Sequence, residues 1–272
     1  MPELPEVETV MRGLSPLLID RVISVVELRA PSLRSPLPKT IAKRLQGQRF
    51  ISLRRRAKYI LADLSGGDTL LIHLGMTGGF FIRNKNQLET HDHMVFHLDN
   101  GQVIAYHDPR RFGQIEIIPA GTTHKAIASL GPEPLNPDFT PNILAAAITN
   151  KKTHIKAALL DQSIVAGIGN IYASEALFHA CIHPERQAGT LKKPEISKLT
   201  QSIKDVLMAS IKAGGSTLRD YRTPNGELGF FQDQFAVYGR EGEKCPDCNC
   251  RNGINRITQN GRSTFFCSKK QR

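Results

Sequence analysis

The sequence predicts an α+β protein with more than one domain, and three observations support this fold class. Residues 3–18 carry apolar side chains at spacings of three and four, which is the spacing of one helical face. From about residue 22 to residue 118 the pattern changes to short runs rich in Val, Ile and Phe, which favour strands. Residues 142–213 return to a helical pattern. A chain of 272 residues is long enough for two domains, with or without a small appended module.

The first half predicts a helix followed by an antiparallel β-sandwich or barrel. The helical stripe of residues 3–18 consists of Val7, Val10, Met11, Leu14 and Leu18. The clearest strand runs are Val22–Leu28, Tyr59–Leu64, Thr69–Leu74 and Val103–Tyr106. Gly66-Gly67 and Asp99-Asn100-Gly101 separate pairs of runs, where a hairpin needs residues that tolerate positive φ.

A proline-rich stretch divides the chain. Residues 130–141 hold four prolines, too many for a regular element, so we predict a linker at 131–141 between a domain at 1–130 and a helical domain at 142–236. The clearest helix of the second domain is Pro194–Ala213, and Gly214-Gly215 ends it. We expect a separate module at 237–272, because four of the five cysteines lie there. The fifth, Cys181, lies in an apolar helical stretch and is interpreted as core.

Composition favours a polyanionic partner and excludes a membrane protein. The net charge is +11, and a basic surface gains free energy from counterion release when it neutralises phosphates, although some basic proteins are merely soluble. No apolar run approaches the roughly 18 residues of a membrane span, and the acidic, proline-containing start is unlike a signal peptide. We therefore expect a cytoplasmic protein, and a monomer because no oligomerisation seam is evident.

The N-terminus carries a latent nucleophile. Removal of Met1 would expose the secondary amine of Pro2 beside the carboxyl group of Glu3. A free α-amino group titrates near pH 8, so part of it is unprotonated at neutral pH and can attack an aldehyde-like carbon to give an iminium. Glu3 could donate a proton to a leaving group or a sugar oxygen. The alternative is ordinary helix initiation, in which proline is common because its missing N–H needs no partner.

Three further segments could bind DNA, and each also has a purely structural interpretation. Gly167-Ile-Gly-Asn170 links two helical patterns and could bind a phosphate, or be only a tight turn. Arg110, Arg111 and Phe112 follow a strand, where guanidinium groups can read base edges and a ring can wedge between base pairs. The neighbouring Met76 offers an exposed thioether or a core side chain.

Two polar clusters are less informative. Residues 54–59 form a basic run leading into a strand, and alternation within a strand would send Lys58 to the face opposite Tyr59. His91-Asp92-His93 could bind a metal or a phosphate, or lie in a surface loop.

The C-terminal cysteines predict a zinc site. Cys245 and Cys248 are spaced to place two thiolates on one metal, and Cys267 follows later. A module with so little core of its own would depend on metal for its fold.

Taken together, several ordered motifs resemble bacterial formamidopyrimidine-DNA glycosylases from end to end. They are MPELPEVET at 1–9, RAKY at 56–59, HLGM at 73–76, DPRRFG at 108–113, GIGNIYASE at 167–175 and the C-terminal cysteines. The resemblance implies a helix-two-turn-helix in the second domain and a β-hairpin zinc finger at the C-terminus. It also implies an enzyme that flips an oxidised purine, such as 8-oxoguanine or a formamidopyrimidine, out of double-stranded DNA and excises it.

The resemblance also implies roles for individual residues. Pro2 would attack C1′, Glu3 would donate protons, Lys58 would contribute to β-elimination and Arg262 to δ-elimination. The loop at 217–231 would close over the flipped base. The remaining matches are DNA-binding positions, at His73, Met76, His91, Arg110, Arg111, Phe112, Lys152, Lys156 and Asn170. By the resemblance, Met76, Arg110 and Phe112 would fill the space vacated by the flipped nucleotide and contact the orphan base. Positions that contact DNA or help hold the lesion are matched by His91, Lys152, Lys156 and Asn170. Leu4-Pro5 and the intact DPRRFG segment separate the chain from the related endonuclease VIII.

The finger departs from the family pattern, which ends in a second Cys-x-x-Cys pair. Here Cys267 is followed three residues later by Lys270 and by no further cysteine. We expect Cys250 to act as the fourth ligand, so that Cys245, Cys248, Cys250 and Cys267 share one zinc ion. The alternatives are three thiolates completed by another ligand, and a finger held without metal.

Two other functions compete with the repair enzyme. A catalytically silent DNA-binding protein would keep the basic surface and the finger, but would not need Pro2, Glu3 and Lys58 together. An N-terminal-proline tautomerase would have no use for a finger or a phosphate-binding turn.

Overall fold

The computed structural model describes residues 1–216, 229–251 and 253–272, and its contacts divide the chain into two compact units. The first unit is Met1–Ala128 with Ala213–Phe230, and the second is Ser129–Lys212 with Phe231–Arg272. The predicted linker at 131–141 lies near the start of the second unit, and the predicted loop at 217–231 falls mostly on 217–228, outside the described residues. No helix in the described part of the chain is both long enough and apolar enough to cross a bilayer.

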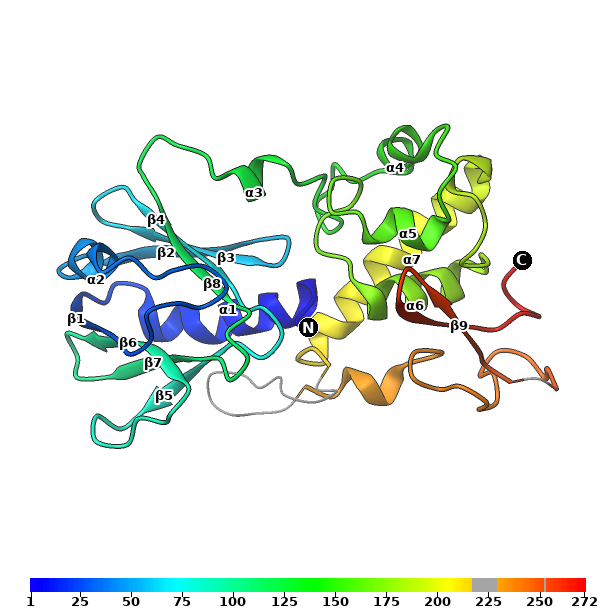
Figure 1. The fold of residues 1–272 in the computed structure, drawn as a ribbon. Helices are drawn as coiled ribbons and strands as arrows, with labels where there is room; N and C mark the ends of the chain where they lie inside the picture. The colour runs from blue at the N-terminus through cyan, green and yellow to red at the C-terminus, as the bar shows by residue number, and fades with distance from the viewer. Residues whose placement is uncertain (217–228, 252) are drawn as a thin grey trace. The chain divides into compact units, whose positions relative to one another are not determined.

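The first unit is an antiparallel β-sandwich with a leading helix, as the sequence predicts (Figure 1). One four-stranded sheet has the order β1-β6-β7-β5, and the other has the order β2-β3-β4-β8. The strands are β1 Ile23–Leu28, β2 Phe50–Arg56, β3 Tyr59–Leu64, β4 Thr69–His73, β5 Gly79–Arg83, β6 Asp92–Leu98, β7 Val103–His107 and β8 Gln114–Ile118. The helices are α1 Leu4–Leu18, α2 Thr40–Leu45 and α3 Lys125–Ala128.

The two predicted hairpins are confirmed. Gly66-Gly67 lies between β3 and β4, which pair antiparallel, and Gly67 has φ +86°. Asp99-Asn100-Gly101 lies between β6 and β7, and Gly101 has φ +83°. Only glycine adopts this backbone region at no steric cost, which is why these turns were readable from sequence.

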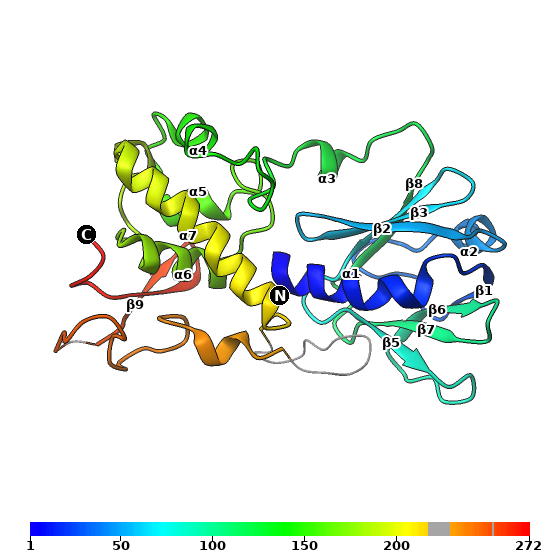
Figure 2. The ribbon, with the colours of Figure 1, turned by 180° about the vertical axis from the view of Figure 1, so that it is seen from behind.

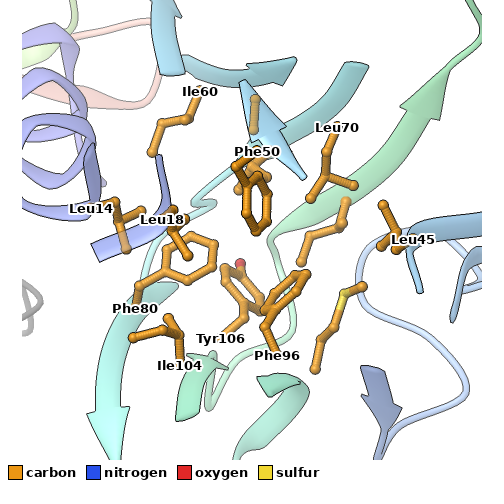
Figure 3. Close-up of a cluster of buried hydrophobic side chains, with 14 of the residues drawn as sticks. Leu14, Leu18, Leu45, Phe50, Ile60, Leu70, Phe80, Phe96, Ile104 and Tyr106 are labelled. Atoms are coloured by element: carbon orange, nitrogen blue, oxygen red, sulfur yellow. The ribbon is translucent and has the colours of Figure 1, made fainter. Parts of the chain in front are cut away.

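Helix α1 joins the two sheets through a shared core. Its apolar stripe, Val7, Val10, Leu14 and Leu18, is buried. Figure 3 shows Leu14 and Leu18 meeting Phe50, Ile60 and Leu70 from one sheet and Phe80, Phe96, Ile104 and Tyr106 from the other. Burial of a large apolar side chain contributes about 1.5–3 kcal/mol, so this cluster fixes the helix, and with it the N-terminus, to the sandwich.

The second unit combines helices with a C-terminal hairpin (Figure 2). Its helices are α4 Pro141–Ile148, α5 Ile155–Leu160, α6 Asn170–Ala180 and α7 Lys193–Lys212, with 3₁₀ turns η1 Ala188–Thr190 and η2 Phe231–Gln234. Strands β9 Asn255–Gln259 and β10 Arg262–Phe266 pair antiparallel. Helix α6 packs against α5, α7 and β10, so it is the centre of this unit.

Candidate active site and nucleic-acid interface

The N-terminus is held by a buried carboxylate one turn into α1. Met1 is 50% exposed, whereas Pro2, Glu3 and Glu6 are buried. The Glu6 Oε2 atom accepts the backbone N–H of Glu3 at 2.9 Å, as in a capping box. Its Oε1 atom accepts the backbone N–H of Ser216 at 2.9 Å and the hydroxyl of Ser216 at 3.0 Å. Glu6 therefore fixes the chain at Glu3 to the residue that precedes segment 217–228.

Lys58 lies in a turn, not within a strand as alternation suggested. Arg56 pairs with Tyr59, so Ala57 and Lys58 form a two-residue connection between β2 and β3. Ala57 has φ +52°, a region in which glycine is usual. Lys58 is 8% exposed. The end of β2 is fixed to α1 by a 2.8 Å ion pair between Arg55 and Glu8.

The imidazole ring of His73, at the end of strand β4, is neutral. Burial, together with the positive charges of Lys58 and Arg34, lowers its pKa to about 4. The Nδ1 atom accepts the backbone N–H of Gly75 at 3.1 Å, which leaves the proton of the neutral ring on Nε2. The ring centroid lies 4.9 Å from that of Tyr59. The ring of His73, which lies within the electrostatic influence of Lys58, is therefore uncharged and is not a second cation.

Two neighbouring loops present the predicted void-filling side chains. Met76 is 38% exposed and Phe112 is 46% exposed, and the guanidinium carbon of Arg110 lies 4.7 Å from the Phe112 ring centroid. Exposure of large apolar side chains to water is unfavourable, and a partner that covers them removes this cost. Their exposure beside a guanidinium group suits insertion into a base stack.

The buried carboxylate of Asp108 links these two loops by hydrogen bonds. Its side chain is fully buried, and its Oδ1 atom accepts the Thr77 hydroxyl at 2.6 Å. Its Oδ2 atom accepts the backbone N–H of Gly113 at 2.8 Å. Thr77 Oγ1 in turn accepts the backbone N–H of Arg110 at 3.3 Å. The loop with Met76 and the loop with Arg110 are thus one hydrogen-bonded unit.

Close backbone approach explains the glycines in both loops. A Cβ atom on Gly75 would lie 2.4 Å from the carbonyl carbon of Phe112, and Gly75 has φ +66°. A Cβ atom on Gly113 would lie 1.7 Å from the hydroxyl of Tyr106, which is fully buried. Both positions therefore require glycine.

The side chains of His91, Asp92 and His93 do not converge on one ligand. Asp92 faces Arg83, which donates two hydrogen bonds of 3.0 and 3.1 Å, and His107, at 2.9 Å. Burial alone would raise the pKa of Asp92, but these hydrogen bonds outweigh burial and lower it. His93 Nε2 lies 2.9 Å from the backbone oxygen of Asp108, while His91 is exposed. Only His91 of the three is placed to reach a phosphate.

The predicted phosphate-binding turn connects α5 and α6. The side-chain amide of Gln162 closes the turn by donating to the backbone oxygens of Leu160, at 3.0 Å, and Ile168, at 2.9 Å, while its oxygen accepts the Gly167 N–H. Gly169 caps α6 in an extended conformation, so Asn170 begins the helix. The start of a helix carries partial positive charge, which favours a nearby anion.

The two lysines preceding this turn differ in environment. Lys152 is exposed, as a phosphate contact requires. Lys156 is 1% exposed, and its Nζ atom lies 2.7 Å from Asn170 Oδ1 and 2.6 Å from Thr264 Oγ1.

The C-terminal cysteines converge. The sulfur atoms of Cys245, Cys248, Cys250 and Cys267 all lie within 4.8 Å of one another. Cys267 Sγ lies 3.5 Å from Cys248 Sγ and 3.6 Å from Cys250 Sγ. Tetrahedral zinc with Zn–S bonds of about 2.3 Å separates its sulfurs by about 3.8 Å, so the spacing fits a metal ion. Desolvation and the neighbouring sulfurs raise the pKa of Cys248 to about 12, as expected for thiols crowded together.

Lys270, at the position of the missing cysteine, packs against α6 instead. Its ammonium group pairs with Asp247 and lies 3.8 Å from the ring centroid of Phe178. Next to it, the side chain of Gln271 accepts the N–H of Cys267 at 2.8 Å and donates to the backbone oxygen of Ile182 at 2.9 Å. The end of the finger is thereby attached to the end of α6.

Glu175 attaches the beginning of the finger to the same helix. Its carboxylate is 1% exposed and accepts three successive backbone N–H groups, from Ala236 at 2.8 Å, Val237 at 3.0 Å and Tyr238 at 2.8 Å. Hydrogen bonds to an ionised acceptor are about twice as strong as neutral ones. Helix α6 therefore positions both ends of the cysteine module.

Comparisons with known proteins agree with this geometry. The family profile of the formamidopyrimidine-DNA glycosylase N-terminal domain matches residues 1–115, and that of the formamidopyrimidine-DNA glycosylase H2TH domain matches residues 130–222. The formamidopyrimidine-DNA glycosylases of Ruegeria pomeroyi and of Ruegeria sp. strain TM1040 are 52% and 51% identical, over the full length of both chains. The chain belongs to the formamidopyrimidine-DNA glycosylase family. It is accordingly a DNA glycosylase of base excision repair with the lyase activity of this family.

Solved structures of family members share the fold. The MutM (Fpg) protein of Thermus thermophilus has 39% identity and a TM-score of 0.89, covering 99% of this chain and 98% of that one. A Lactococcus lactis Fpg mutant in complex with Fapy-dG DNA has 35% identity and a TM-score of 0.90, with full coverage of both chains. The fold class and the family expected from sequence are therefore confirmed for this glycosylase.

Sequence reasoning missed the residues that support the site. Glu6, Asp108 and Glu175 lie within recognised motifs, yet their partners are distant in the chain and unreadable from spacing. The finger hairpin could have been located, because Asn260-Gly261 is a strong two-residue hairpin signal and both residues have positive φ.

Proposed function

We propose that this glycosylase excises oxidised purines, 8-oxoguanine and formamidopyrimidines, from double-stranded DNA through an iminium formed by Pro2. The observation that carries the proposal is the N-terminus, where Pro2 and Glu3 are buried at the start of a helix fixed by Glu6. Once Met1 is removed, this arrangement would hold a secondary amine in a fixed direction beside a carboxyl group. Family members solved with Fapy-dG and with 8-oxo-G DNA support the lesion class.

The reaction would run in three steps. The unprotonated nitrogen of Pro2 bonds to C1′ while the bond from C1′ to the base breaks, and Glu3 gives a proton to the departing base. The Glu3 carboxylate then takes the proton of the bonded Pro2 nitrogen and passes it to O4′ as the bond from C1′ to O4′ breaks. The resulting iminium acidifies the C2′ hydrogen, and its loss expels the 3′ phosphate in a β-elimination to which Lys58 contributes. Arg262 would assist the δ-elimination that expels the 5′ phosphate, which leaves a one-nucleotide gap.

The exposed residues would bind the DNA around this centre. Met76, Arg110 and Phe112 would fill the space of the flipped nucleotide and contact the orphan base. Phosphate contacts would come from His91, Arg111 and Lys152, which are exposed, and from the start of α6 at Asn170. His73 would support the catalytic cluster from beneath. Because the substrate is chromosomal DNA, the enzyme would act in the bacterial cytoplasm, at the nucleoid, as a monomer.

A single structural zinc ion would hold the finger. We propose Cys245, Cys248, Cys250 and Cys267 as its ligands, with Cys250 replacing the cysteine absent at Lys270. The mutual distances of the sulfurs support this set. We expect Cys250→Ser to lose zinc affinity in a chelator competition, while Cys181→Ser, outside the cluster, retains it. Equal zinc affinity in the two variants would remove Cys250 from the site.

The catalytic proposal is tested by borohydride trapping on a duplex with 8-oxoguanine opposite cytosine, in protein whose mass shows that Met1 is absent. We expect lesion-dependent cleavage and a covalent adduct on Pro2, with neither on undamaged duplex nor with Pro2→Gly. A silent DNA-binding protein would bind the duplex without cleavage or adduct. A tautomerase would show no tight, salt-sensitive binding to the duplex at all.

A further inference from the structure

Lys156 is a buried cation in the middle of the DNA-binding unit. It is 1% exposed, whereas Lys152, four residues earlier and before the start of α5, is exposed. An ammonium group loses a large hydration free energy when it is buried, so its hydrogens must find acceptors within the protein. The positions of those acceptors indicate the role of the Lys156 side chain.

Oxygen atoms of three residues in the described part of the chain lie within hydrogen-bond distance of the Lys156 ammonium group. Its Nζ atom lies 2.6 Å from Thr264 Oγ1, 2.7 Å from Asn170 Oδ1 and 3.2 Å from the backbone oxygen of Ser263. An ammonium group has three N–H donors, and these oxygen atoms can accept all of them. A DNA phosphate would have to displace one of them.

These contacts join three elements that are distant in sequence. Lys156 lies on α5, Asn170 begins α6, and Ser263 and Thr264 lie on β10 of the finger hairpin. Asn170 strengthens the junction, because its Nδ2 atom donates to the backbone oxygen of Ser263 at 2.9 Å. The side chain of Lys156 therefore connects both helices of the turn motif to the finger.

The contacted strand carries the predicted δ-elimination residue. Arg262 is exposed and directly precedes Ser263, after the Asn260-Gly261 turn. Thr264 also fixes the opposite strand, because its hydroxyl donates to Gln259 Oε1 at 2.8 Å. The ammonium group thus holds strand β10 directly, next to Arg262, and reaches strand β9 only through the Thr264 hydroxyl.

We propose that Lys156 is a positioning residue that orients the hairpin and thereby Arg262, rather than a residue that contacts DNA. This inference rests on the proposed function for the role of Arg262. The effect of Lys156 on the hairpin can be measured without DNA. The positioning role of Lys156 and the proposed function can therefore be refuted separately.

The test compares full-length, zinc-loaded wild type with Lys156→Met, Thr264→Val and Lys152→Met. Methionine keeps most of the length and the flexibility of lysine without its charge, and valine keeps the shape of threonine without its hydroxyl. The first measurement is amide hydrogen exchange of residues 255–266 in the absence of DNA. The second is the ratio of δ- to β-elimination product on a duplex with a preformed abasic site, and the third is the salt dependence of binding to a duplex with a tetrahydrofuran abasic analogue.

We expect Lys156→Met and Thr264→Val to accelerate exchange of the hairpin about tenfold or more, because a lost buried hydrogen bond destabilises the structure that it closes. Both should lower the ratio of δ- to β-elimination product and leave the slope of log K against log salt unchanged. Lys152→Met should lower the magnitude of that slope by about 0.9, the value for one phosphate contact, and leave hairpin exchange unchanged.

The proposal is overturned if Lys156→Met lowers the slope by about 0.9 while hairpin exchange is that of wild type, since Lys156 would then be a phosphate contact. Exchange in the β-sandwich and α7 reports whether each variant is folded. Should Lys156→Met not fold, unchanged hairpin exchange in Thr264→Val would equally refute the positioning role. Wild type that gives no borohydride adduct would refute the proposed function, while hairpin exchange would still decide the role of Lys156.

Discussion

Replacement of Asp108 by asparagine should uncouple the two loops that present the proposed void-filling side chains. The carboxylate is fully buried and accepts the Thr77 hydroxyl and the Gly113 N–H through different oxygen atoms. Asparagine retains one acceptor oxygen, and its NH₂ group must then face either a backbone N–H, which cannot accept, or the Thr77 hydroxyl. Whichever way the amide turns, one hydrogen bond is lost or reversed.

The expected magnitude follows from the bonds replaced. A hydrogen bond to an ionised group contributes about 1.5–3 kcal/mol and a neutral one about 0.5–1.5 kcal/mol. Loss of the charge weakens both bonds, and one is no longer satisfied, so Asp108→Asn should lower the free energy of unfolding by about 2–4 kcal/mol. Thr77→Val removes the long 3.3 Å hydrogen bond from the Arg110 N–H as well as the bond to Asp108, and should cost about 2–3 kcal/mol. Because the two residues share that bond, the double variant should be more stable than the sum predicts, by about 1 kcal/mol.

Urea unfolding and single-turnover excision of 8-oxoguanine provide the two assays. Asp99→Asn is the matched control, because Asp99 is exposed and its substitution should change stability by less than about 0.5 kcal/mol. Phe112→Ala is the functional control, since a 46% exposed ring should be dispensable for stability but not for excision. Additive effects of Asp108→Asn and Thr77→Val, or a loss below about 0.5 kcal/mol for Asp108→Asn, would refute the coupling of the loops.

Three further outcomes follow from the structure. Because the folded state keeps His73 neutral down to a pKa of about 4 while the unfolded chain takes up a proton below about 6.5, stability should fall by about 3 kcal/mol as pH drops through this window. His73→Gln should remove that part of the pH dependence in urea titrations. Glu175→Gln should cost about 2–4 kcal/mol in thermal unfolding and loosen the finger, whereas exposed Glu185→Gln should be neutral. Gly113→Ala would place its Cβ atom 1.7 Å from a buried tyrosine hydroxyl and should cost more than about 3 kcal/mol, while Gly66→Ala, which meets only a glutamine side chain, should be tolerated. Equal stability of the two glycine variants would contradict the close approach.

The architecture was predictable because its determinants are local. The helical stripe of α1 and the glycines of the hairpins act over a few residues, and each appears in the structure where the sequence places it. The turn at Ala57-Lys58 was not predictable, because it contains no residue that favours positive φ and is formed where β2 and β3 pair. Its conformation is set by tertiary structure rather than by local propensity.

The environment of charged side chains was the least predictable property. Lys152 and Lys156 have the same chemistry and lie four residues apart in the sequence, yet it is Lys156 that contacts the finger, at Thr264, 108 residues later. Likewise, no spacing rule links Glu6 to Ser216. Periodicity indicates which face of a helix is apolar. It does not indicate which polar group, distant in the sequence, will bind a buried charge.

Buried carboxylates explain how exposed functional groups can be held in a defined orientation. Glu6 supports the N-terminus, Asp108 the two void-filling loops and Glu175 the start of the finger, and each accepts backbone N–H groups of the segment that it orients. Side chains that must enter a base stack or reach a phosphate cannot bury themselves, so their backbone has to be fixed from beneath. Substitutions at the three carboxylates should therefore lower stability and activity together, whereas substitutions at the exposed side chains that they support should lower activity alone.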